Sequence, residues 1–182
     1  TDFRAEALRI GGEKVHTDRT MDVHNPHTGE RVGTVSMASL DDVRRAYDIA
    51  HAYVPALSRY DRSAILNRAA ALLRERTQAA AALITSESGL SMKDSVYEIG
   101  RVADVLNFGA NESLRDDGQV FSCDLTPHGK HRKVITTREP LLGVITAITP
   151  FNHPMNQVAH KVVPSVATNN RMVLKPSEKV PL

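Results

Sequence analysis

Two short apolar stretches, joined by a segment of helical length, constrain the fold of this chain more than any other feature. Residues 142–148 read Leu-Gly-Val-Ile-Thr-Ala-Ile, and residues 171–175 read Arg-Met-Val-Leu-Lys. We predict strands over both stretches and a helix over 154–168 between them. A strand that is almost wholly apolar is typical of a parallel sheet buried on both faces. The chain is therefore predicted to have an α/β fold, with its ligand where the two strands end.

Helices are expected to fill most of the chain before this unit. Ser39, with the acid Asp42 three residues later, resembles a capping box and predicts a helix start. Apolar side chains at helical period predict one long helix from about 61 to 87 and another over 91–113. Gly89 lies between them as the expected C-terminal cap of the long helix.

The remaining segments read as β-structure. A hairpin is predicted over residues 8–15, and an edge strand over 31–37, where apolar and polar residues alternate. Residues 119–139 read as a second hairpin with too few apolar residues for a core of its own. Such an arm is expected to pack against a partner subunit.

Composition excludes several classes of partner. The net charge is +2 and aromatic residues make up 4% of the chain, so binding to nucleic acid has little support. No apolar run approaches the ~20 residues that span a bilayer, so no membrane segment is expected. One cysteine among 182 residues makes no internal disulfide and suits a reducing compartment, so the protein is expected to be cytoplasmic.

Short motifs occur along the whole chain: Asn25-Pro26-x-Thr28-Gly29-Glu30, Glu139-Pro140-Leu141-x-Gly143-Val144, Thr149-Pro150-Phe151-Asn152, Pro164, Asn170 and Lys175-Pro176-Ser177-Glu178. In this order and spacing they resemble the N-terminal third or more of the NAD(P)-dependent aldehyde dehydrogenases. Within that family the segments around Asn152 and Lys175 are most similar to the phosphonoacetaldehyde dehydrogenase branch, with lactaldehyde-type members close behind.

The resemblance implies a domain organisation. Residues 1–121 would form the N-terminal hairpin and helices of a Rossmann-type coenzyme domain, and residues 141–182 its first strand–helix–strand. Residues 122–140 would form a β-hairpin oligomerisation arm that builds a homodimer or homotetramer. The catalytic domain is absent, and two parallel strands alone make an unstable sheet. The chain is therefore expected to be the N-terminal part, or a fragment, of a larger enzyme.

The resemblance also implies the chemistry. In the family a cysteine thiolate adds to the aldehyde, the resulting thiohemiacetal passes hydride to NAD, and a glutamate activates the water that hydrolyses the thioester. Asn152 would direct its side-chain amide at the aldehyde oxygen, as a neutral donor to charge that develops during attack. The alternative is that Asn152 only caps the helix that begins near Pro154. Neither nucleophile nor base lies in these residues, so the chain alone is expected to be inactive.

Coenzyme binding is assigned, by resemblance, to the motif after the second strand. Lys175 and Glu178, with Ser177 between them, would hold the adenine-ribose end of NAD. A carboxylate accepts hydrogen bonds from both ribose hydroxyls but repels a 2′-phosphate, so NAD is favoured over NADP. The alternative is a solvated lysine and glutamate in a loop. One wall of the coenzyme cleft would consist of Ile148, Thr149, Pro150 and Phe151.

Two basic residues indicate the substrate. His153 stands beside Asn152, where many family members have an aromatic residue, and Arg101 stands on the 91–113 helix at a place that lines the family's substrate tunnel. Arginine suits bidentate recognition of a phosphonate or carboxylate. The pair therefore predicts a small anionic aldehyde, with phosphonoacetaldehyde the first choice and lactaldehyde or a semialdehyde the alternatives. The competing interpretation is a structural salt bridge of Arg101, with Glu98 as one candidate partner, and a helix-start role for His153.

Other reactive side chains are given structural roles. Cys123 lies in the arm, outside the family's nucleophile segment. The pairs His24/His27 and His128/His131 lie in turns without cysteine or acidic partners at ligand spacing, so no metal is predicted. A second hypothesis for the chain as a whole is a truncated, non-catalytic module that binds a nucleotide or another subunit.

Overall fold

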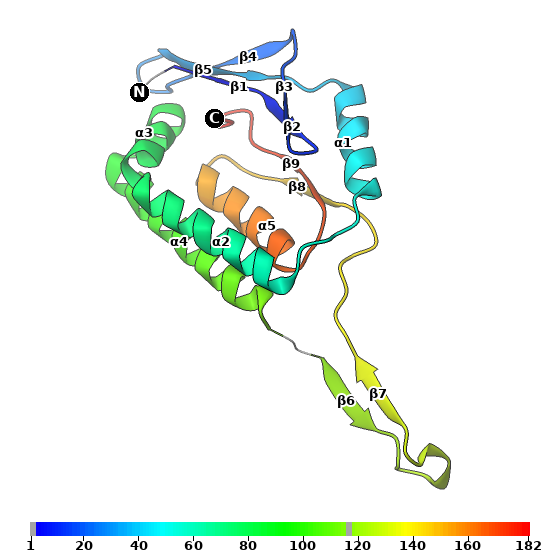
Figure 1. Cartoon of the computed structure of the whole chain (residues 1–182). Coiled ribbons are helices and arrows are strands. Elements are labelled where there is room, and N and C mark those ends of the chain that lie inside the picture. Colours follow the sequence, from blue (N-terminus) through cyan, green and yellow to red (C-terminus); the bar gives the residue numbers. More distant parts are fainter. Residues whose placement is uncertain (1–2, 116–117) are drawn as a thin grey trace.

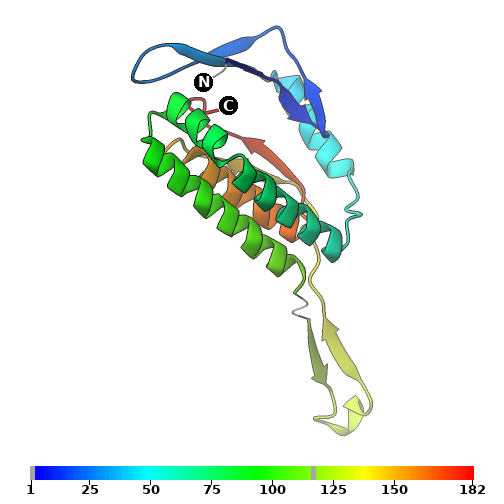
Figure 2. The same ribbon diagram turned by 60° about the vertical axis from the view of Figure 1, so that its left-hand side comes forward.

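The fold consists of a β-rich layer, a layer of packed helices, a pair of parallel strands between them and a projecting hairpin (Figure 1). The structure is a computed structural model that describes residues 3–115 and 118–182. The predicted N-terminal segment, residues 1–121, therefore includes residues 1–2 and 116–117, which lie outside the described residues. The chain begins in the β-rich layer and returns to it at its last residues, close to where it began (Figure 2).

The helical layer holds the main core. It contains α2 (Arg59–Glu75), α3 (Thr77–Ser88), α4 (Met92–Ser113) and α5 (Pro154–Ala167). Helices α2, α4 and α5 lie side by side in both views (Figures 1 and 2). The side chains that fill the space between them share an apolar character and near-complete burial: Leu66, Leu73, Ala81, Ile84, Ile99, Val102, Ala103, Ala110, Ala159, Val163 and Ala167. The core face predicted for the 91–113 helix is thereby confirmed.

A glycine lets α4 approach α5 closely. A Cβ atom on Gly109 would lie 2.2 Å from Cγ1 of Val163, nearer than side chains tolerate. No other residue type fits there without a shift of one helix. This contact packs the C-terminal half of α5 closely against α4.

The single long helix predicted over 61–87 is wrong, because the chain bends between α2 and α3. Arg76 has φ −105° and ψ 14°, and its N–H is shared between the carbonyls of Leu72 and Leu73. The hydroxyl of Thr77 donates to the carbonyls of Leu73 and Arg74. Such local side-chain bonds compete with the helical ladder and bend it. Arg76 at this bend is exposed.

Capping residues set the helix starts. Ser39 and Asp42 form the predicted capping box at the start of α1 (Leu40–Ala52). A second capping box, formed by Ser58 and Asp61, starts α2 and was not anticipated. Gly89 ends α3 with φ 76°, as its place in the sequence predicts.

The β-rich layer contains one element that the sequence did not reveal. Strand β1 (Arg4–Glu6) pairs in parallel with β5 (Arg31–Ser36), which pairs on its other side with β4 (Thr20–His24). The predicted edge strand over 31–37 is therefore the centre of a three-stranded sheet, because β1 covers its free edge. The predicted hairpin over 8–15 is present as β2 (Leu8–Ile10) and β3 (Glu13–Val15).

The strand–helix–strand unit is present with a shorter first strand. β8 (Ile145–Ile148) pairs in parallel with β9 (Met172–Lys175), and α5 connects them. The residues before β8 bend away, and Leu142 is 92% exposed. Burial on both faces is also wrong for β8, since only its Ala147 is buried and Ile148 is 68% exposed. Ile145 of β8 and Met172, Val173 and Leu174 of β9 are half-buried.

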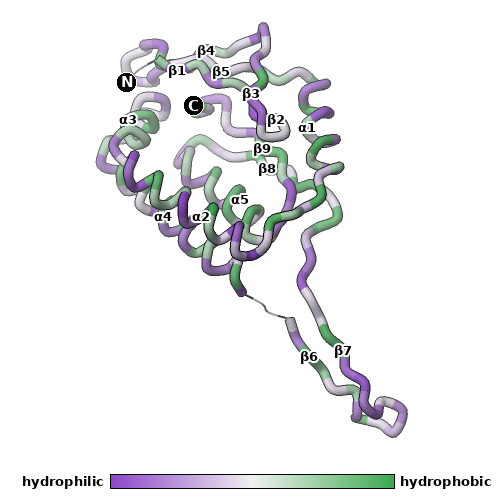
Figure 3. The backbone as a smooth tube through the Cα atoms, in the orientation of Figure 1, coloured by the Kyte–Doolittle hydropathy of each residue, from purple (hydrophilic) through white to green (hydrophobic). Residues whose placement is uncertain are grey.

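The hairpin between α4 and β8 projects away from the body (Figure 1). It consists of β6 (Gln119–Ser122), the short 3-10 helix Pro127–Gly129 and β7 (Lys133–Thr136). All eight strand residues are exposed, and each strand carries two adjacent apolar residues between polar ones, so hydrophobic and hydrophilic colours both appear along the arm (Figure 3). The arm therefore has no core of its own among the described residues.

Candidate functional site

The candidate site lies where β8 and β9 end side by side. The N–H of Thr149 donates to the carbonyl of Lys175 over 3.2 Å, so the loop after β8 leaves the sheet beside the loop after β9. The first loop, residues 149–153, leads directly into α5, and the second is residues 176–180. The two segments that carry the predicted residues, separated by more than twenty positions, are thus brought together as expected for an open parallel sheet.

Asn152 stands exposed in the first loop. The N-cap residue of α5 is His153, and the described residues contain no hydrogen bond from the Asn152 side chain that would cap the helix. The alternative reading of Asn152 as a cap is therefore wrong. Its amide is left able to donate to a ligand at the rim of the site.

His153 contacts a buried acid from α4. Its Nδ1 lies 3.4 Å from Oε2 of Glu98, whose side chain is 1% exposed, whereas the His153 side chain is 40% exposed. The other oxygen of Glu98 accepts a hydrogen bond of 2.8 Å from the N–H of Asn156, in the first turn of α5. Glu98 therefore ties α4 to the start of α5 directly beneath the Asn152 loop. From the sequence alone, this glutamate was expected only as a possible partner of Arg101.

Arg101 lies one turn beyond Glu98 on α4 and is exposed. Within residues 3–115 and 118–182 its guanidinium makes no ion pair, and the carboxylate of Glu98 is directed at α5 instead. The competing interpretation, a salt bridge between Arg101 and Glu98, is therefore wrong. Arg101 is therefore an exposed cation on α4, the helix whose Glu98 contacts His153.

Lys175 and Glu178 form a pair at the end of β9. Lys175 Nζ lies 3.1 Å from Glu178 Oε2, and both side chains are more than half exposed. The backbone N–H of Glu178 itself, followed by Lys175, lowers the pKa of the Glu178 carboxyl below its ordinary value. The carboxylate is therefore ionised at neutral pH and open to a ligand with hydroxyl donors. Ser177, between them, is buried, and its Oγ accepts a hydrogen bond from the N–H of Lys179.

The two loops also touch through a lysine that the sequence did not single out. Lys179 Nζ lies 4.2 Å from the centre of the Phe151 ring, a cation–π contact between the two strand ends. Phe151 remains 50% exposed, Thr149 is buried, and Ile148 and Pro150 are exposed. Three of the four residues predicted to form one wall of the cleft therefore have exposed side chains.

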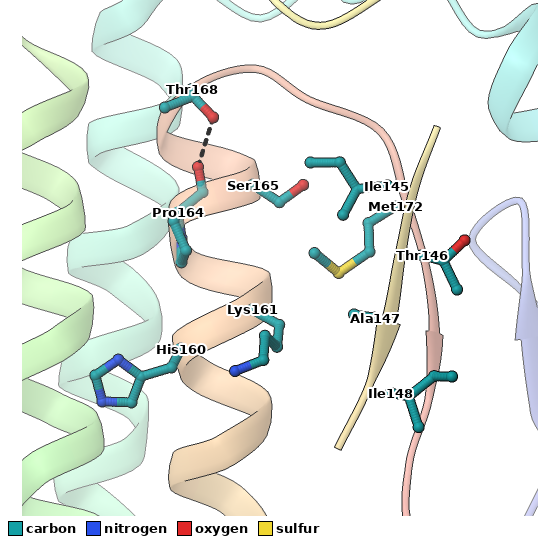
Figure 4. A pocket seen from close by; sticks show the side chains of 10 residues that line it. All are labelled: Ile145, Thr146, Ala147, Ile148, His160, Lys161, Pro164, Ser165, Thr168 and Met172. Carbon is teal, nitrogen blue, oxygen red and sulfur yellow. Dashed lines mark hydrogen bonds between the residues drawn. The ribbon is translucent and has the colours of Figure 1, made fainter. Parts of the chain in front are cut away.

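Two hollows flank the strand ends. One, of about 380 Å³, lies between β8 and α5, where Lys161 and Ser165 face Ile145 and Met172 (Figure 4). The other, of about 470 Å³, is lined by Phe151, Glu178 and Lys179 from the two loops together with residues of β4 and the end of α3. The candidate coenzyme residues therefore border a concave surface rather than a flat one.

Arg171 is a further residue that the sequence analysis missed. Its guanidinium donates to four backbone carbonyls, those of His51, Tyr53, Leu141 and Leu142. It joins the end of α1 to the segment before β8 and to the start of β9. The only signal in the sequence is a charged residue at the start of an apolar strand, which does not identify its partners.

The described residues contain no group of three or more histidine, cysteine, aspartate and glutamate side chains that could hold a metal ion. None of the described helices is long and apolar enough to cross a membrane.

Known proteins resemble this chain over nearly its full length. The profile of the aldehyde dehydrogenase family matches residues 14–182. The 3-sulfolactaldehyde dehydrogenase of Priestia aryabhattai is 36% identical over 183 residues, which cover 100% of this chain and 38% of that protein. Aspartate-semialdehyde dehydrogenase 1 of Pseudomonas canavaninivorans is 37% identical over 165 residues, 89% of this chain and 35% of the relative.

Solved structures agree with these sequence relatives. Aldehyde dehydrogenase 21 from Physcomitrella patens, in complex with the reaction product succinate, has a TM-score of 0.90 and 31% identity, covering 100% of this chain and 38% of that chain. Homologous solved structures are NAD- or NADP-dependent enzymes. The likeness confirms the predicted α/β fold, and the chain spans 35–38% of the length of the three relatives described.

Proposed function

Since this chain belongs to the aldehyde dehydrogenase family, we propose that it supplies the coenzyme-binding part of an enzyme that oxidises a small anionic aldehyde with NAD. The observation that carries the proposal is the exposed guanidinium of Arg101. It makes no ion pair within the described residues, and it lies one turn from the glutamate that holds His153 and the Asn152 loop. Two basic groups thus flank the residue proposed to bind the aldehyde oxygen.

Asn152 is proposed to stabilise the charge that forms on that oxygen. Its amide is exposed and not used as a helix cap, so an N–H is available for a new acceptor. A neutral donor binds a ground-state carbonyl weakly and an oxyanion strongly, which favours the transition state.

Glu178 and Lys175 are proposed to hold the adenine-ribose of the coenzyme, with Ser177 fixing the turn between them. An ionised, exposed carboxylate fits a pair of vicinal hydroxyls, each of which can donate to one oxygen. The same negative charge would repel a 2′-phosphate, so the residues present fit NAD better than NADP. Thr149 and Pro150 supply backbone, and Ile148 and Phe151 supply exposed apolar surface, along one wall. When bound, the coenzyme accepts hydride from the aldehyde carbon.

The relatives support an anionic tail on the substrate. Their names specify 3-sulfolactaldehyde and aspartate semialdehyde, and the plant structure holds succinate. Sulfonate and phosphonate are both tetrahedral anions with three oxygens, and an arginine fork binds two of them at once. We therefore place phosphonoacetaldehyde and 3-sulfolactaldehyde together as the preferred substrates, ahead of uncharged lactaldehyde.

The remaining chemistry is assigned outside these 182 residues. The one thiol, Cys123, lies in the projecting arm and not beside Asn152 (Figure 1). These residues alone are therefore expected to have no dehydrogenase activity. The exposed arm is proposed to join subunits into a homodimer or homotetramer.

The proposal is tested by Arg101→Ala in the full-length enzyme that contains this chain. Loss of a charge-assisted hydrogen bond predicts a fall in kcat/KM of about 10–100-fold for phosphonoacetaldehyde or 3-sulfolactaldehyde, and little change for lactaldehyde. Lys93→Ala, which removes another exposed cation from α4, is the matched control and should leave both values unchanged. Equal losses for charged and uncharged aldehydes would rule out the anion-binding role.

A further inference from the structure

Glu98 is a buried acid whose partners all belong to the candidate site. It is 1% exposed and is one of the largest side chains with essentially no contact with solvent. A buried carboxylate is costly unless hydrogen bonds and a positive group compensate it. Retaining one here, in a core otherwise filled by apolar residues, requires partners that repay this cost.

The first partner is the N-terminal end of α5. The first four N–H groups of a helix have no acceptor within the helix. The N-cap, His153, contributes no side-chain bond, and the first turn of α5 contains no acidic residue. Glu98 supplies from α4 what α5 lacks, because its Oε1 accepts from the N–H of Asn156 over 2.8 Å. A negative charge at this end is also favoured by the helix dipole.

The second partner is the imidazole of His153. Oε2 of Glu98 accepts no hydrogen bond within the described residues, and His153 Nδ1 lies 3.4 Å away. This separation is longer than a good hydrogen bond, and the contact is an ion pair only when the imidazole carries both protons. A proton on Nδ1 is the donor that this oxygen lacks. With Nδ1 directed at Glu98, Nε2 occupies the opposite side of the ring.

We infer that Glu98 is the positioning residue of the substrate site: it fixes the ring of His153 and the start of α5, and thereby holds Nε2 of His153 and the amide of Asn152 in register with Arg101. Arg101 belongs to the same helix as Glu98, three residues further on. Helix α4 therefore carries Arg101, one of the two proposed anion-binding residues, and through Glu98 it anchors His153, the other. This inference rests on the proposed function for its consequence in catalysis, but not for its geometry.

The test uses Glu98→Gln in the full-length enzyme. Glutamine keeps an oxygen for the N–H of Asn156 and nearly the same volume, but it removes the charge that faces His153. We expect KM for 3-sulfolactaldehyde to rise about five- to tenfold, with little change in kcat and little change in either constant for lactaldehyde. Glu112→Gln, at an exposed glutamate of the same helix that pairs with Arg115, is the matched control and should change neither.

A double-mutant cycle separates positioning from general stabilisation. If Glu98 acts through His153, the rise in KM on Glu98→Gln should disappear in a His153→Ala background. A purely structural role would instead lower kcat for both aldehydes and persist in that background, and this result would overturn the inference.

Crystal structures of the wild-type and Glu98→Gln enzymes provide a readout that is independent of activity. The inference predicts that the His153 ring leaves its place beside residue 98 in the variant, while α5 keeps its start. An unchanged ring would overturn the inference even if the enzyme prefers anionic aldehydes. A wild-type enzyme with no such preference would overturn the proposed function, while a displaced ring would still support the positioning role.

Discussion

The interior beneath α4 and the strand ends above it treat polar and apolar groups in opposite ways. In the interior, several buried polar groups have partners within the fold: Oε1 of Glu98 accepts from the N–H of Asn156, and the buried guanidinium of Arg62 donates to the carbonyls of Leu57 and Ala167. Oε2 of Glu98 and Oδ1 of Asn156 are buried without a hydrogen bond. At the strand ends, by contrast, charged and apolar side chains alike remain open to solvent.

The difference shows which residues hold the site and which are available to a ligand. Glu98 holds the start of α5, Gly109 allows the close packing of α4 against Val163 of the same helix, and both residues are buried. Arg101, Asn152 and Glu178 are exposed on the surface that this arrangement creates. Substitutions in the first group should change stability or placement, and substitutions in the second group should change ligand binding or rate with little effect on folding.

The largest effect is expected for Asn152→Ala. Removing one oxyanion donor lowers kcat by about 10²–10³-fold. Because Asn152 is exposed and caps nothing, the melting temperature should stay unchanged. Steady-state kinetics of the full-length enzyme and a thermal melt measure the two quantities, with Asn67→Ala, at an exposed site on α2, as the control. A large drop in stability with a normal kcat would show that Asn152 holds the fold and does not stabilise the transition state.

Glu87 should make stability depend on pH in the unusual direction. Burial raises the pKa of its carboxyl from 4.5 to about 7, against the effect of the N–H of Leu182, which donates to it. The folded state therefore holds the proton more tightly than the unfolded state does. The contribution to stability is complete below pH 4.5 and is lost as the pH rises through about 7, a change of about 3 kcal/mol.

Denaturant unfolding of wild type and Glu87→Gln from pH 4.5 to 8 measures this contribution. The free energy of unfolding of the wild type should fall, relative to that of the variant, as the pH rises. A difference that is constant with pH would show that Glu87 is not buried as described. Glu112→Gln, at an exposed position, should show such a constant difference.

Two glycines of α4 offer a matched comparison within one helix. Gly109→Ala places a methyl group against Val163 and should destabilise the protein by about 1–3 kcal/mol. Gly100→Ala meets nothing within 4 Å and should stabilise it by about 0.5–1 kcal/mol. Urea denaturation measures both changes. Equal effects would mean that α4 and α5 are not in the close contact described.

The smallest effects are expected for the two capping boxes. Ser58→Ala should cost about 1 kcal/mol of global stability, because α2 belongs to the core. Ser39→Ala removes the same cap from α1, which has no buried residue, and should mainly increase amide hydrogen exchange within α1. A global loss as large for Ser39→Ala as for Ser58→Ala would show that α1 is part of the cooperative core.

Local signals predicted much of this fold. The capping box at Ser39, the stop at Gly89 and the helical period of the core residues of α4 each depend on neighbours within a few positions. Asn169 has a left-handed backbone, φ 60°, a conformation that asparagine tolerates better than most residues. The family resemblance adds which residues surround the strand ends, and the structure brings those residues together.

Long-range pairings could not be predicted. β1 is three residues long, and its parallel pairing with β5 makes a supposed edge strand central. Glu98 and His153 are 55 positions apart, and a buried glutamate looks in the sequence like any other helical acid. The apolar pattern of β8 predicts burial on both faces, but only its Ala147 is buried.

We propose above all that Arg101 and His153 select an aldehyde by its negative charge. The most direct test compares kcat/KM of the full-length enzyme, with NAD, for 3-sulfolactaldehyde and for lactaldehyde. These substrates differ only by a sulfonate group in place of a hydrogen on the terminal carbon. The account predicts a preference of about 10–100-fold for the sulfonate, as one charge-assisted contact provides. Equal values, or a preference for lactaldehyde, would contradict it.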